Sequence, residues 1–139
     1  MQSILNATEL FPADMLPEMI APFLAETPSE DLWLTCEKDS RVIGLCYARS
    51  EDLTDGTWNM LAIAVDPALQ GTGAGAAMTA YLEQSLKVQG VRILIVDTSG
   101  TDDFALTRAF YAKNGYEAEA RIRDFWAAGD DKVIFRKAL

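Results

Sequence analysis

Three glycines stand close together in the sequence QGTGAGA, residues 70–76, which follows a short apolar run ending at Val65. Glycine lets the backbone approach a ligand closely, and a helix that begins here would point its first free N–H groups at an anion. The helix dipole adds a partial positive charge, worth roughly 0.3–1 kcal/mol for an anion at an exposed site. This pattern is typical of a loop that binds a phosphate group.

The segments on either side of the glycines favour the same interpretation. Residues 57–65 are predicted to form a buried strand, which ends at Asp66 and Pro67 because proline has no N–H to give to a sheet. Residues 73–88 carry apolar side chains at helical spacing, and residues 91–96, VRILIV, are predicted to form a second buried strand. A strand, helix, strand order implies a right-handed crossover, so the two strands should be parallel.

Two known phosphate-binding motifs fit the glycines less well. A P-loop needs Lys and then Ser or Thr after its last glycine, where this chain has Ala76 and Ala77. A dinucleotide-binding fold accounts for Gly71, Gly73 and Ala76, and Asp97 follows about twenty residues later, near the expected position of a ribose-binding acid. In that fold, however, the glycine turn follows its strand almost directly, and about forty residues after Asp97 are few to complete it.

Two segments resemble motifs of the GNAT family of N-acetyltransferases. Residues 70–75 match the core of its acyl-CoA-binding motif, Gln/Arg-x-x-Gly-x-Gly/Ala, and the Val-Asp-Pro that precedes this core in the family stands at 65–67. Residues 109–116, AFYAKNGY, resemble a second family segment, in which a tyrosine precedes Gly-Phe/Tyr and reaches the thioester sulfur. The resemblance covers the chain from about Trp33 to the C-terminus.

The resemblance implies an α/β protein with the acyl-CoA N-acyltransferase fold, in which helices lie on both faces of a central mixed, mostly antiparallel sheet of about six strands. It implies one domain over residues 1–139, as the length also suggests. It further implies that acetyl-CoA binds as co-substrate to backbone groups of the strand and the glycine loop. The residues concerned are Ile63, Ala64, Val65, Gln70, Gly71, Thr72, Gly73, Ala74, Gly75 and Ala76.

The same resemblance suggests catalytic roles. Tyr111 would protonate the departing thiolate, for which a phenol with a pKa near 10 is a reasonable match. Asp97 stands where some members carry a catalytic glutamate and is the candidate general base, with a water chain as the alternative. Asn59 stands near the position of another family glutamate and cannot take a proton. Phe104 replaces an asparagine that contacts the cofactor in many members.

Composition limits the remaining functions. The net charge of −9 argues against nucleic acid as a partner, and no apolar run is long enough to span a membrane. With no histidine, the commonest general base and metal ligand are missing, and we expect no metal. No secretion signal is visible, so we expect a cytoplasmic protein whose two cysteines are reduced. An edge strand and exposed aromatic side chains would allow a homodimer.

The function expected is therefore direct transfer of an acetyl group from acetyl-CoA to a primary amine. The acceptor, a small molecule or a peptide, is not identified by the sequence. One alternative is a non-catalytic acyl-CoA-binding or regulatory module on the same fold, because Asp97 is an uncertain base and Phe104 departs from the family. A dinucleotide-binding domain is the other.

The flanking segments lead to further expectations. Residues 1–7 could form a brief edge strand, and residues 11–24 a helix that Pro22 breaks or kinks. A two-residue turn at 39–40 would join two strands and place Cys36 opposite Ile43. Residues 102–114 should form a helix with Leu106 in its core stripe, and two further strands should follow.

Overall fold

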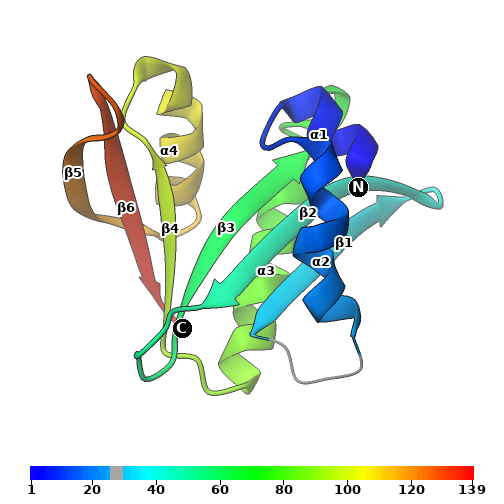
Figure 1. Cartoon of the computed structure of the whole chain (residues 1–139), viewed down its shortest axis with the longest axis horizontal. Helices are drawn as coiled ribbons and strands as arrows, with labels where there is room; N and C mark the ends of the chain where they lie inside the picture. The colour runs from blue at the N-terminus through cyan, green and yellow to red at the C-terminus, as the bar shows by residue number, and fades with distance from the viewer. Residues whose placement is uncertain (26–29) are drawn as a thin grey trace.

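The structure, a computed structural model, describes residues 1–25 and 30–139 (Figure 1). The α-helices are α1 (Gln2–Thr8), α2 (Leu16–Leu24), α3 (Ala74–Val88) and α4 (Ala105–Lys113). The strands are β1 (Asp31–Lys38), β2 (Arg41–Ser50), β3 (Thr57–Val65), β4 (Ile93–Ser99), β5 (Glu117–Ala127) and β6 (Asp130–Ala138). Short 3-10 helices occupy Ala13–Met15, Pro67–Leu69 and Asp102–Phe104.

The six strands form one sheet in the order β1-β2-β3-β4-β6-β5. Only β3 and β4 are parallel, and the other neighbouring strands are antiparallel. This is the mixed, mostly antiparallel sheet that the sequence predicts. The dinucleotide-binding alternative, which requires a mostly parallel sheet, is therefore wrong.

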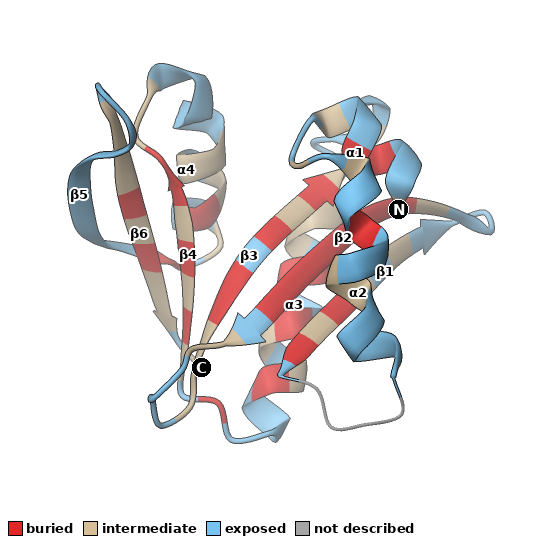
Figure 2. Ribbon diagram, in the orientation of Figure 1, coloured by how far each residue is buried: buried red, intermediate tan, exposed pale blue. Residues whose placement is uncertain are grey.

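Helices cover both faces of this sheet. Helices α1 and α2 pack against β1, β2 and β3 on one face, and α3 packs against the same strands on the other (Figure 1). Two buried clusters correspond to these layers (Figure 2). The larger one joins α3, α4 and the sheet and includes Cys46, Met60, Leu82, Leu94, Val96, Tyr111, Tyr116 and Phe135. The smaller one lies under α1 and α2 and includes Leu5, Trp33, Leu45, Tyr47, Ala62 and Ala64.

The sheet is divided at the parallel pair. Strands β3 and β4 are paired only from Thr57 opposite Ile93 to Asn59 opposite Ile95, and they then diverge (Figure 1). We call β1, β2 and β3 the first wing, and β4, β6 and β5 the second wing. Beyond Asn59, the edge of β3 that faces the second wing has no strand partner in the described part of the chain.

A bulge in β3 lies next to this divergence. Tyr47 is opposite Ala62 whereas Ala48 is opposite Met60, so Leu61 is an extra residue in β3. The extra residue reverses which face the following side chains point to. Met60 accordingly lies in the larger cluster, but Ala62 lies in the smaller one.

Several local expectations are wrong. Residues 2–8 form a helix instead of an edge strand, and α2 continues through Pro22 to Leu24. The turn at 39–40 is present, but a register shift between Cys36 and Glu37 places Cys36 opposite Gly44. The two cysteines are nevertheless free thiols.

The core stripe of α4 also differs from the expectation. Leu106 is 86% exposed, and Tyr111 is the buried residue of this helix. No helix among the described residues combines the length and the apolar character needed to cross a membrane.

Candidate active site

The loop between β3 and α3 carries a run of backbone donors without acceptors. In the described part of the chain, none of the N–H groups from Gly71 to Ala76 makes a hydrogen bond. The first paired amide is that of Ala77, whose nitrogen lies 2.9 Å from the Gly73 carbonyl oxygen. Helix α3 therefore begins with its N-terminal donors free to bind an anion.

The shape of the loop depends on two of its glycines. Gly71 and Gly73 have φ angles of 75° and 93°, a conformation that costs other residues roughly 1–2 kcal/mol. A Cβ atom added at either position would have no atom within 4 Å, so open space lies beside the free amides. Gly75 differs, because a Cβ there would lie 3.4 Å from the ring of Phe110 on α4.

Polar side chains of the loop are engaged within it. The side-chain amide of Gln70 donates to the Val65 carbonyl oxygen over 3.3 Å. The Thr72 hydroxyl donates to the Leu69 carbonyl oxygen over 2.6 Å. Asp66 accepts a hydrogen bond from the Ala68 amide at 3.0 Å and stabilises the turn that follows β3. These contacts leave the main-chain N–H groups as the donors that the loop offers to a ligand.

These features fit the diphosphate of an acyl-CoA. Neutral main-chain donors can hold an anion without a cluster of lysines, which suits a chain with a net charge of −9. The unpaired edge of β3, residues 60–65, leads away from the loop and could pair with the amide groups of an extended pantetheine arm. The predicted binding residues Ile63, Ala64 and Val65 lie in this part of β3.

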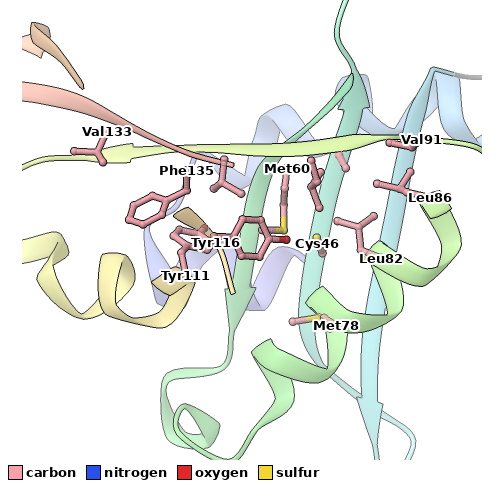
Figure 3. Packing of buried hydrophobic residues seen from close by; sticks show 13 residues of the cluster. Cys46, Met60, Met78, Leu82, Leu86, Val91, Tyr111, Tyr116, Val133 and Phe135 are labelled. Atoms are coloured by element: carbon pink, nitrogen blue, oxygen red, sulfur yellow. The ribbon is translucent and has the colours of Figure 1, made fainter. Parts of the chain in front are cut away.

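Tyr111 lies at the meeting point of the two wings. It is 4% exposed and belongs to the larger buried cluster, where its ring contacts those of Phe110, Tyr116 and Phe135 at centroid distances of 5.4, 5.8 and 5.5 Å. Figure 3 shows Tyr111, Tyr116 and Phe135 beside Met60 and Cys46. Tyr111 is therefore a core residue and not a tyrosine packed on the surface of a helix.

The environment keeps the Tyr111 phenol protonated. Burial raises the pKa of Tyr111 well above its usual value, and the nearby Cys46 thiol raises it further. The hydroxyl makes no hydrogen bond with the described residues. Cys46 is the cross-strand partner of Ile63, so the phenol interacts with the first wing at the level of the strand predicted to bind the pantetheine arm.

Asp97, the candidate base, is already paired. One of its carboxylate oxygens lies 3.0 Å from the ammonium of Lys132, which also lies 4.0 Å from the centre of the Phe125 ring. The other oxygen is buried and has no hydrogen-bond partner among the described residues. The ion pair with Lys132 therefore occupies one of the two oxygens with which Asp97 could accept a proton from an amine.

Tyr111 and Asp97 lie on opposite faces of the sheet. Val96 packs with Tyr111 in the larger cluster, and side chains alternate along a strand, so Asp97 points to the other face. A ligand can contact both faces only where the wings diverge, beyond Asn59 and Ile95. An acid on one face and a base on the other would suit a thioester placed between them.

Two residues depart from the family pattern. Asn59 is buried, and its side-chain amide donates to the Glu51 carboxylate over 2.9 Å, while its own oxygen has no partner in the described chain. Phe104 is 44% exposed at the start of α4.

The sequence alone did not predict the pairing of Lys132 with Asp97, because only the register of β4 with β6 brings these residues together.

A family model for the acetyltransferase (GNAT) family matches residues 2–116. This match spans most of the chain, and the protein therefore belongs to the GNAT acetyltransferase family. No curated protein is significantly similar to the chain.

Solved structures of the family have the same fold. A protein from Desulfovibrio desulfuricans assigned to the GNAT family is 31% identical, with a TM-score of 0.89, over 99% of this chain and 88% of its own. An aminoglycoside 6'-N-acetyltransferase complexed with coenzyme A is 17% identical, with a TM-score of 0.79 and coverages of 99% and 87%. The ribosomal-protein-S18-alanine N-acetyltransferase of Escherichia coli is 18% identical, with a TM-score of 0.78 and coverages of 99% and 84%.

Proposed function

We propose that this protein transfers an acetyl group from acetyl-CoA directly to a primary amine. The observation that carries the proposal is the run of free N–H groups from Gly71 to Ala76 beside open space. Family membership supports acetyl transfer as the reaction class. When bound, acetyl-CoA supplies an activated acetyl group as a thioester.

In this reaction some residues of the chain would bind acetyl-CoA and others would transfer protons. The loop amides hold the diphosphate, and backbone groups of Ile63, Ala64 and Val65 orient the pantetheine arm, with one N–H directed at the thioester oxygen. Such a donor stabilises the negative charge that develops on this oxygen during attack by the amine. Tyr111, kept protonated by its buried environment, donates its proton to the departing sulfur.

The amine must lose a proton when it attacks, and either Asp97 or water would accept this proton. Asp97 can take this proton if its ion pair with Lys132 opens. Otherwise a water chain removes it, which suffices for an amine whose pKa is near neutral. The acceptor would approach from the face of the sheet to which Asp97 points, because Tyr111 and the larger cluster fill the other face.

Calorimetry with CoA and acetyl-CoA tests binding, and thiol release in a screen of small amines and peptide N-termini tests catalysis. No heat with either compound at millimolar concentration would refute the whole proposal.

The paired state of Asp97 favours one alternative, a non-catalytic acyl-CoA-binding module. Binding of acetyl-CoA without thiol release from any amine would support this module over the enzyme.

A further inference from the structure

A half-buried polar network connects the two wings on the face that carries α3 and α4. Glu83 belongs to α3, which packs against the first wing. One oxygen of its carboxylate accepts a hydrogen bond from the Tyr116 hydroxyl at 2.9 Å. The other accepts from the Lys137 ammonium at 2.7 Å. Tyr116 follows α4 and Lys137 lies in β6, so one carboxylate holds two elements of the opposite wing.

The network extends into the last turn of α4. The Lys137 ammonium also donates to the Asn114 carbonyl oxygen over 2.8 Å. The side chain of Asn114 in turn donates to the Phe110 carbonyl oxygen over 2.7 Å. Backbone N–H groups of Asn114 and Tyr116 donate to the Tyr111 carbonyl oxygen at 3.0 and 3.1 Å. Each of these bonds restrains the helical turn from which the Tyr111 side chain projects.

Side-chain packing adds a second connection to Tyr111. The Tyr116 ring lies edge-on to the Tyr111 ring at 5.8 Å, and both belong to the larger cluster (Figure 3). The side chains of Glu83 and Lys137 are 16% and 27% exposed, so water screens their charges only partly. A Glu83 that moved would therefore displace Tyr116 and, through it, the Tyr111 ring.

The position of the network explains why it matters for the proposed reaction. Lys137 is opposite Leu94, which is in turn opposite Trp58, so the network lies at the level where the wings are still joined. Tyr111 projects toward the first wing where the strands part. A largely desolvated ion pair seldom adds much net stability over apolar packing of the same shape, but it can fix geometry. Here that geometry is the position of α4 relative to α3 and β3.

We propose that Glu83 is a positioning residue for Tyr111. By holding Tyr116 and Lys137, it sets how far the Tyr111 phenol reaches across the junction of the wings. This inference rests on the proposed function, in which Tyr111 protonates the thiolate. It predicts that the network can be weakened with little effect on acetyl-CoA binding, because none of the free N–H groups of the glycine loop takes part in it.

The test uses Glu83→Gln, which keeps the size of the side chain and removes the charge that holds Lys137. We expect kcat with acetyl-CoA and an amine that the wild type acetylates to fall at least about tenfold, because small misplacements of catalytic groups are costly. KM for acetyl-CoA should stay within about twofold. Glu117→Gln is the matched control, because Glu117 is exposed and follows Tyr116 directly.

A second measurement does not depend on activity. The protein contains four tyrosines, so labelling with 3-fluorotyrosine gives four fluorine NMR signals that tyrosine-to-phenylalanine variants assign. We expect the Tyr111 signal to move in Glu83→Gln and to stay in place in Glu117→Gln. If Glu83→Gln does not fold, Tyr116→Phe takes its place, since it removes only the hydroxyl that Glu83 holds.

The outcomes separate the inference from the proposed function. An unmoved Tyr111 signal, or an unchanged kcat in Glu83→Gln, would overturn the positioning role. If the Tyr111 signal moves in Glu83→Gln but the wild-type protein acetylates no amine, the proposed reaction is refuted, while the mechanical connection between Glu83 and Tyr111 is supported.

Discussion

Replacing Gly73 by alanine tests the proposed diphosphate site most directly. Gly73 precedes the first residue of α3 with φ at 93°, and the space where a Cβ would stand is empty to 4 Å. The added methyl group therefore causes no steric clash in this variant. The free energy of unfolding should fall only by the strain of alanine in a left-handed conformation, about 1–2 kcal/mol. For a chain of this length, such a loss corresponds to a fall in Tm of about 3–8 °C.

Gly90 provides the matched control at the opposite end of the same helix. Its φ is 84°, and a Cβ there would also have no atom within 4 Å. Gly90→Ala should therefore lose about the same stability as Gly73→Ala. It lies beyond the C-terminus of α3, far along the helix from the free amides, so its effect on ligand binding should be negligible.

The two variants should differ in their affinity for CoA. A methyl group at Gly73 would stand in the open space beside the donors and keep an anion at a distance. Loss of one charge-assisted hydrogen bond is worth about 1.5–3 kcal/mol, which raises Kd by roughly 10- to 150-fold. Calorimetry with CoA measures this effect without turnover, and thermal unfolding measures the strain. Equal affinities of the two variants for CoA would refute the assignment of this loop.

Three other outcomes are expected. Tyr111→Phe should lower kcat about 10²-fold with little change in KM or Tm, because the hydroxyl has no hydrogen bond in the described structure; an unchanged kcat would reject the acid role. Asp97→Asn should lower kcat by a similar factor, whereas Lys132→Met should not; equal activity of wild type and Asp97→Asn would assign proton removal to water. Burial raises the pKa of Cys46 from 9.0 to about 12, so folding favours the protonated thiol, and this stability is complete below pH 9 and lost as pH rises toward 12. Chemical denaturation should thus show that the free energy of unfolding falls less steeply with pH in Cys46→Ala than in the wild type, by about 1.4 kcal/mol per pH unit between pH 9 and 12. Parallel curves of this free energy against pH would contradict the buried thiol.

Local patterns in the sequence were sufficient to predict the elements from β1 onward and the class of the protein. An apolar run ended by Asp66 and Pro67, glycines and an amphipathic helix define β3, the loop and α3, because each signal lies within a few residues. The hairpin turn at 39–40 and the order of the later strands are equally local. Family membership follows from the same motifs, since the residues that give the loop its backbone conformation are consecutive in the sequence.

The tertiary structure decided which side chains meet. The bulge at Leu61 and the register shift between Cys36 and Glu37 change the faces and the partners of the neighbouring side chains, and no residue type in the sequence predicts either. The pairing of Lys132 with Asp97 arises from β6 lying between β4 and β5. Glu83 likewise meets Tyr116 and Lys137 across 33 and 54 residues of sequence. Propensity acts over a few residues, whereas these contacts depend on how whole strands and helices pack, so the acid, its support and the partner of the candidate base emerged only from the fold.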